Sequence, residues 1–66
     1  MQIEVNAVPT EVADGALVAT LIATLALAGK RIAVEVNGEL VPRSRFDSQR
    51  LAPGDRVEII QAVGGG

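Results

Sequence analysis

The spacing of the apolar residues changes twice along this chain. Over positions 1–5 they alternate with polar residues, so Ile3 and Val5 share one face of a predicted strand. Over 18–25 they recur at the spacing of a helix that buries one face. Alternation returns over 32–36 and again over 56–63. This pattern predicts a β-sheet with a single helix lying across one of its faces.

Turn and capping residues divide the chain between these segments. Turn residues over 6–9 predict a hairpin with its second strand at 10–13. Asp14 is predicted to cap the helix, whose buried stripe runs from Val18 to Leu25. We expect the helix to end near Ala26 and Leu27 to fold back under its last turn.

The second half of the chain has its own turn signals. Asn-Gly at 37–38 predicts a type I′ hairpin between strands at 32–36 and 39–41. Pro42 ends the short strand, and Ser44 is predicted to cap a helical turn that brings Phe46 into the core. Pro-Gly at 53–54 fits a type II turn before the last strand.

This order of elements requires one crossover connection, so the sheet is mixed. We expect an α+β fold of the β-grasp kind, with a mixed sheet of four to five strands and one main helix packed across one face. A chain of 66 residues is long enough for one such domain, over 1–66, with a flexible C-terminal tail at 64–66.

Composition limits the chemistry that the chain can perform alone. It contains no His and no Cys, and therefore no imidazole base, no thiolate nucleophile and no soft metal ligand. No glycine-rich phosphate loop ending in Lys and Ser or Thr is present. We expect no enzyme, no metal site and no bound cofactor, and any ATP would be bound by a partner.

Charge and hydropathy narrow the class of partner. Six basic and eight acidic side chains give a net charge of −2, and Phe46 is the one aromatic residue, which argues against nucleic acid. The uncharged run over 16–28 is too short to span a bilayer, and acidic rather than basic residues precede it, unlike a signal peptide. We expect a cytoplasmic protein without a membrane partner.

Three consecutive glycines, Gly64, Gly65 and Gly66, end the sequence directly after a strand-type segment. At an average glycine usage of about 7%, such an ending has a chance probability on the order of a few in ten thousand. Glycine lacks a Cβ atom, so this backbone can thread a narrow channel, and three extended residues reach about 10 Å. Unless the segment is merely a frayed end, it predicts that the Gly66 carboxylate is delivered into a partner's active site.

Three segments carry a family resemblance. They are an Asn-Gly turn followed by Val-Pro-Arg over 36–44, the turn and strand over 53–59, and the glycine ending over 62–66. Together they resemble the ThiS family, sulfur-carrier proteins of thiamine biosynthesis with a ubiquitin-like β-grasp fold. The resemblance covers essentially the whole chain.

The resemblance implies a protein cosubstrate. An adenylylating activating enzyme, ThiF-like and similar to the enzyme that activates ubiquitin, would use ATP to adenylylate the Gly66 carboxylate. A sulfur donor protein would then allow sulfur to replace the adenylate, giving a thiocarboxylate. Thiazole synthase, ThiG-like, would take that sulfur for the thiazole ring of thiamine.

The last strand supplies candidate contacts for these partners. If Val57 and Ile59 face the helix, alternation sends the intervening residues to the open face. A large apolar residue would then be exposed close to the tail. Single exposed apolar residues are common on proteins, so this one is as compatible with no function as with a contact for a partner. The predicted partner-binding residues are Ile60, Ala62 and Glu58, with Arg43 and Arg56 as charges at the rim.

Three other interpretations stay open. A sulfur carrier of molybdopterin synthesis, or of another sulfur-transfer pathway, shares the fold and the Gly-Gly ending, but is usually longer and often has proline before the tail, where this chain has 61–63 Gln-Ala-Val. A ubiquitin-like protein modifier would form isopeptide bonds through Gly66. A β-grasp binding module would have an inert tail.

Overall fold

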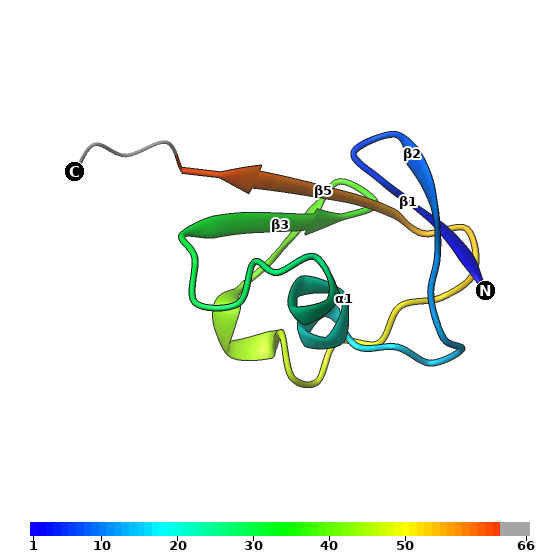
Figure 1. Ribbon diagram of the computed structural model, residues 1–66, viewed down its shortest axis with the longest axis horizontal. Helices are drawn as coiled ribbons and strands as arrows, with labels where there is room; N and C mark the ends of the chain where they lie inside the picture. Colours follow the sequence, from blue (N-terminus) through cyan, green and yellow to red (C-terminus); the bar gives the residue numbers. More distant parts are fainter. Residues whose placement is uncertain (63–66) are drawn as a thin grey trace.

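A mixed five-stranded sheet and one α-helix make up the part of the chain that the computed structural model describes, residues 1–62 (Figure 1). The elements are β1 (Gln2–Val5), β2 (Val8–Glu11), α1 (Val18–Thr24), β3 (Ile32–Val36), β4 (Glu39–Val41), the 3-10 turn η1 (Arg43–Arg45) and β5 (Arg56–Gln61). The strand order is β2-β1-β5-β3-β4, and β1 and β5 run parallel. The predicted β-grasp fold class is confirmed.

The β1–β2 hairpin turns more tightly than the sequence suggested. Asn6 and Ala7 have positive φ, 49° and 68°, so the turn takes two residues and β2 begins at Val8. Pro9 therefore lies within β2, an edge strand, and not in the turn as predicted. The Val5–Val8 pair next to such a turn is hydrogen-bonded and the following pair is not, so the missing Pro9 N–H faces solvent.

Helix α1 begins without a side-chain cap. It starts at Val18, whose N–H donates to the Gln49 carbonyl at 2.9 Å, and the next residue donates to the Phe46 carbonyl at 2.8 Å. Asp14 lies instead 3.1 Å from the amine of Met1. The predicted cap by Asp14 was therefore wrong, because carbonyl groups distant in sequence satisfy the first N–H groups of the helix.

The helix ends in a Schellman motif at Ala26. This residue has a φ of 60°, and its N–H donates to the Ala23 carbonyl at 3.0 Å. The Leu27 N–H donates to Ile22 at 2.9 Å, and its side chain packs against the core, as predicted. Leu25, predicted to belong to the buried stripe, is 37% exposed because it is the C-cap, past the last helical turn.

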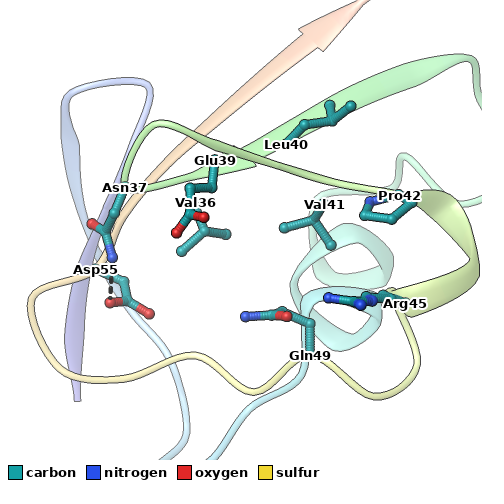
Figure 2. Close-up of a pocket in the computed structure, with 9 residues that line it drawn as sticks. All are labelled: Val36, Asn37, Glu39, Leu40, Val41, Pro42, Arg45, Gln49 and Asp55. Atoms are coloured by element: carbon teal, nitrogen blue, oxygen red, sulfur yellow. Dashed lines mark hydrogen bonds between the residues drawn. The ribbon is translucent and has the colours of Figure 1, made fainter.

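The turns of the second half are largely as predicted. Asn37 and Gly38 have φ of 53° and 85°, as a type I′ turn requires. The Asn37 side chain also holds the start of β5, since it accepts the Arg56 N–H at 2.9 Å and donates to Asp55 at 3.0 Å (Figure 2). Gly54, with a φ of 81°, fits the predicted type II turn before β5.

The turn η1 corrects one further prediction. Pro42 occupies its N-cap position, so Ser44 lies within the turn and caps nothing. Phe46 is half-buried and packs against the core, in line with its predicted position.

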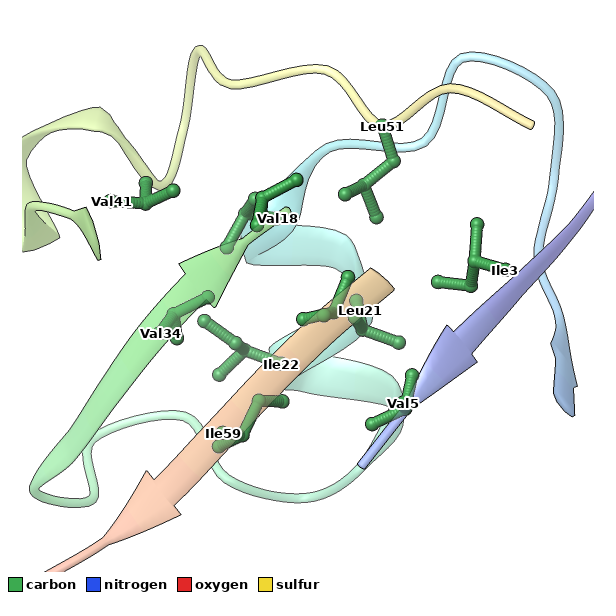
Figure 3. Close-up of a cluster of buried hydrophobic side chains, with 11 residues drawn as sticks. Ile3, Val5, Val18, Leu21, Ile22, Val34, Val41, Leu51 and Ile59 are labelled. Carbon is green, nitrogen blue, oxygen red and sulfur yellow. The ribbon is translucent and has the colours of Figure 1, made fainter. Parts of the chain in front are cut away.

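Aliphatic side chains fill the space between the sheet and α1 (Figure 3). Alternate residues of the strands point inward and meet the buried face of the helix. Leu51, from the segment before β5, closes the core near the start of α1, where its N–H donates to the Ala16 carbonyl at 2.8 Å. The buried members are Ile3, Val5, Val18, Leu21, Ile22, Val34, Val36, Val41, Leu51, Val57 and Ile59. Within the described residues, no helix is long and apolar enough to cross a membrane.

Candidate functional site

The residues predicted to carry the chemistry, Gly64, Gly65 and Gly66, lie outside the described residues, as does Val63, the predicted end of the last strand. The structure describes the base from which they extend, which is β5 followed by Ala62. In residues 1–62, no group of three or more His, Cys, Asp or Glu side chains could hold a metal ion. The candidate site is therefore the end of β5 and the surface around it.

β5 is the central strand of the sheet, with β1 on one edge and β3 on the other. Its pairing with β3 extends from Val57 to Gln61, which lies opposite Ile32. The N–H of Ala62 then donates to the Arg31 carbonyl at 2.9 Å. The last described residue is thus still bonded to the segment that leads into β3.

Alternation along β5 orients the predicted partner residues as expected. Val57 and Ile59 face α1 and are 1% and 9% exposed. Glu58, Ile60 and Ala62 are exposed, and Ile60 keeps 60% of its surface accessible. The orientation of these side chains is confirmed, whereas their binding to a partner stays a prediction.

Three of the five predicted partner residues line one hollow of about 320 Å³, which we name the tail-side hollow. Arg43 reaches it from η1, where its guanidinium donates to the Lys30 carbonyl at 3.1 Å. The surface of the hollow is almost entirely apolar and includes the carbon stems of two arginines, next to the end of β5. Its lining is Arg31, Ile32, Ala33, Arg43, Ile60 and Ala62.

Arg31 and Ala33 were not predicted as site residues. Ala33 lies directly opposite Ile60 in the β3–β5 register, and Arg31 precedes β3. The available signal was the alternation over 32–36, which puts Ala33 on the open face, together with the basic pair Lys30-Arg31. Sequence alone could not pair them with the last strand, because strand register depends on the whole sheet.

The other two predicted residues, Arg56 and Glu58, lie elsewhere on the sheet. They line a separate hollow of about 270 Å³ with Glu35 and the Asn37 turn. A further hollow of about 300 Å³, between β4 and Gln49, also adjoins this turn (Figure 2). β5 begins near the turn and ends near the tail-side hollow, so the hollow that contains Arg56 and Glu58 lies toward the end of the strand remote from the tail. The hollow in Figure 2 instead extends from the turn along β4 to Arg45.

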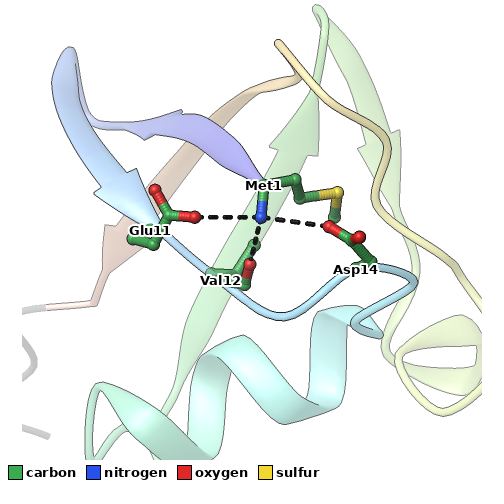
Figure 4. Close-up of polar contacts among 4 residues, drawn as sticks. All are labelled: Met1, Glu11, Val12 and Asp14. Carbon is green, nitrogen blue, oxygen red and sulfur yellow. Dashed lines mark hydrogen bonds and ion pairs between the residues drawn. The ribbon is translucent and has the colours of Figure 1, made fainter.

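The amino terminus forms a charged cluster near the start of β1 (Figure 4). The Met1 amine donates to the Val12 carbonyl at 2.7 Å and lies 3.0 Å from a Glu11 oxygen and 3.1 Å from an Asp14 oxygen. Two hydrogen bonds raise the pKa of this amine above its usual value of 8.0, the one with Glu11 having the larger effect and the one with Asp14 the smaller. Met1 and the end of β5 lie at opposite ends of the molecule (Figure 1).

Comparisons with known structures match both the fold and the sequence. The crystal structure of the thiamine biosynthesis protein (ThiS) from Geobacter metallireducens has a TM-score of 0.85 and 36% identity, with each chain covered in full. An NMR structure of a thiamine biosynthesis protein from the same organism has a TM-score of 0.81 and 36% identity, covering 100% of this chain and 88% of that one.

Sequence comparisons point the same way. A model of the ThiS family matches residues 3–66. An uncharacterized protein ycf40 of Porphyra purpurea is 35% identical over 66 residues, which is 100% of this chain and 93% of that protein. A thiazole synthase of Paramagnetospirillum magneticum is 30% identical over 66 residues, and this chain spans 20% of its length.

Proposed function

The chain belongs to the ThiS family of sulfur carriers in thiamine biosynthesis, and from this membership we propose that Gly66 carries the sulfur as a terminal thiocarboxylate. The observation that carries the proposal is that the family match runs through Gly66, just past a strand held in the middle of the sheet. No Cys occurs among the 66 residues, so no side-chain thiol could take this role. The chain would serve partner enzymes as a protein cosubstrate.

The terminal carboxylate suits the first step of this chemistry. A terminal carboxyl has a pKa of about 3.3–3.7, so at pH 7 it is an anion that can attack the α-phosphorus of ATP. This attack forms an acyl adenylate and releases pyrophosphate. Sulfur at the oxidation level of hydrosulfide then attacks the acyl carbon and expels AMP, which leaves the thiocarboxylate and releases a proton. ATP is bound by the activating enzyme, and the carrier itself holds no cofactor.

The partners of these steps follow from the same chemistry. A ThiF-like adenylylating activating enzyme would form the adenylate, a sulfur donor protein would supply the sulfur, and a ThiG-like thiazole synthase would accept it. The relative from Paramagnetospirillum magneticum supports the last partner, because a fifth of a protein named thiazole synthase resembles this whole chain. The proposed chemistry requires neither a nucleic acid nor a membrane as a partner.

The tail-side hollow is the surface that we propose these partners contact. Ile60 supplies exposed apolar area, and Arg31 and Arg43 add two positive charges beside it. An apolar centre with charged residues around it is typical of protein–protein interfaces. A partner bound here would lie beside the end of β5, where the tail begins.

Intact mass measurement tests the proposal. After incubation with ATP, the activating enzyme and a sulfur donor, the chain should gain first the mass of an adenylate and then that of one sulfur in place of one oxygen. A variant with one alanine added after Gly66 is the matched control, and it should stay unmodified because its carboxylate is displaced by one residue. Modification of the extended variant would contradict the proposal.

Three further experiments distinguish the alternative functions. Isopeptide-linked adducts on lysines of other proteins would identify a ubiquitin-like modifier. Full activity after removal of Gly66 would identify a binding module whose tail is inert. Sulfur transfer to the molybdopterin pathway in place of thiazole formation would change the pathway and leave the carrier mechanism intact.

A further inference from the structure

The side chain of Asn6 continues the sheet where the main chain of β1 stops. Parallel pairing joins β1 to only two residues of β5, Arg56 and Val57. The Asn6 N–H then donates to the Val57 carbonyl at 2.9 Å. Its side-chain oxygen accepts the Ile59 N–H at 2.8 Å, and its side-chain nitrogen donates to the Ile59 carbonyl at 3.2 Å. One amide side chain thus makes both bonds to Ile59, which continued parallel pairing would take from two successive main-chain groups of β1.

The backbone conformation at Asn6 explains why a side chain takes this place. Asn6 is the first residue of the hairpin turn, with a φ of 49°, so the main chain leaves the direction of β5 at this point. Asparagine tolerates positive φ better than most residues, and its short amide carries both a donor and an acceptor. Both requirements, the turn and the two bonds to Ile59, meet in one residue.

The two bonds from the Asn6 side chain are the last hydrogen bonds that the described residues make to β5 on its β1 edge. Ile59 lies opposite Val34 of β3 in the register, but its own N–H and carbonyl both bond to Asn6 on the other edge. Beyond it, Gln61 and Ala62 are attached on the β3 side, through the β3 register and the bond to Arg31. Without the Asn6 side chain, support on the β1 edge would stop at Val57. β5 continues past the β1–β2 hairpin toward the tail (Figure 1).

We propose that Asn6 is a positioning residue for the carrier reaction, which holds the end of β5 so that the tail enters the activating enzyme in one direction. The proposal rests on the proposed function, because it concerns how the Gly66 carboxylate is presented. Restricting a reacting group before binding lowers the entropic cost of reaching the reactive geometry. Asn6 acts through Ile59 and has no assigned contact with a partner.

The chain provides a matched control for this residue. Asn37 is also the first residue of a two-residue turn, with a φ of 53°, and its side chain also makes two hydrogen bonds at β5. Those bonds go to Arg56 and Asp55, at the start of the strand. Asn6→Gly and Asn37→Gly each remove one amide side chain and keep a residue that adopts positive φ without strain.

Amide hydrogen exchange and activation kinetics together test the proposal. In Asn6→Gly, the Ile59 amide should exchange about tenfold faster than in the wild type, the change that corresponds to about 1.4 kcal/mol. With the Asn6→Gly variant as the carrier substrate, the kcat/KM of the activating enzyme for ATP–pyrophosphate exchange should fall about three- to tenfold. In Asn37→Gly, the Arg56 amide should exchange faster, while Ile59 exchange and kcat/KM stay within about twofold of the wild type. All measurements are made well below the melting temperature of both variants.

Two results would overturn the proposal. One is unchanged Ile59 exchange in Asn6→Gly, which would show that the side chain does not hold the strand. The other is an equal loss of kcat/KM in both variants, which would show a general structural role. If the activating enzyme does not adenylylate even the wild type, the proposed function fails, whereas Ile59 exchange still decides whether Asn6 holds β5.

Discussion

At the scale of single residues, Ala26 adopts a backbone conformation that its side chain disfavours. Its φ of 60° is required by the Schellman motif that ends α1. The left-handed region costs a residue with a Cβ atom roughly 1–2 kcal/mol, and glycine avoids that cost at the price of a more flexible unfolded chain. Ala26→Gly should therefore raise the free energy of unfolding by about 0.5–1 kcal/mol, measured by urea denaturation.

The control for Ala26 lies three positions earlier, within α1. Ala23 is also exposed but has helical geometry within α1. Ala23→Gly should lower the free energy of unfolding by about 0.5–1 kcal/mol, because glycine is disfavoured inside helices. A loss of stability in both variants would contradict the role assigned to the left-handed conformation.

Ile60 is the residue through which the docking surface can be tested most directly. It is 60% exposed, so Ile60→Arg should change the free energy of unfolding by no more than about 0.5 kcal/mol. If partners contact the tail-side hollow, the same change should weaken binding to the activating enzyme by about tenfold or more, since central apolar contacts dominate interfaces. Circular dichroism and titration calorimetry measure the two effects.

Val8 gives a matched control for this substitution. It is also 60% exposed, and it lies on β2 at the far edge of the sheet. Val8→Arg adds the same charge and should bind the activating enzyme as the wild type does. Undiminished binding of Ile60→Arg, or an equal loss in both variants, would refute a specific contact at Ile60.

At the scale of elements, the sequence predicted those whose signals are local. Alternation identified the inward faces of β1, β3 and β5, and Asn37-Gly38 identified its turn from φ requirements alone. The start of α1 could not be predicted in the same way, because carbonyls of Phe46 and Gln49 replace a local cap. The site was predictable only where its signals are local. The exposure of Ile60 follows from alternation, whereas its neighbours Ala33 and Arg31 follow from strand register.

The amino-terminal cluster connects β1 and β2 to the segment before α1, and it predicts a dependence of stability on pH. Bonds to Glu11 and Asp14 raise the pKa of the Met1 amine above 8.0. The stabilisation is fully present below the unfolded pKa of 8.0 and is lost as the pH rises through the higher folded pKa. The melting temperature should therefore fall as the pH rises above about 8, where the chain has no His or Cys to titrate.

Acetylation of the amine is the control for this dependence. The acetylated chain lacks the titrating group, so it should melt at a lower temperature near pH 7 and show a flatter profile above pH 8. Thermal denaturation over this pH range, followed by circular dichroism, measures both profiles. Parallel profiles for the free and acetylated chains would show that the cluster does not contribute to folding stability.

At the scale of the whole molecule, the topology separates the anchoring of the tail from the surfaces around it. β5 is the central strand, so the segment leading to the tail is held by β3 and by the β1–β2 hairpin with Asn6. The tail-side hollow lies near the end of β5, and the hollow that contains Arg56 and Glu58 lies near its start. A partner that engages the tail can therefore use the first hollow without contacting the second.

This separation bears on which synthase accepts the sulfur. Carriers of the thiamine and molybdopterin pathways present the same terminal chemistry, so selectivity has to come from differences in affinity over the surface beside the tail. The thiocarboxylate form should support thiazole formation with thiazole synthase and its small-molecule substrates. With the large subunit of molybdopterin synthase, sulfur transfer should be absent or at least about tenfold slower, a difference of about 1.4 kcal/mol. Comparable transfer to both would identify a shared carrier, and the opposite preference would contradict selectivity for thiazole synthase while leaving the terminal chemistry unchanged.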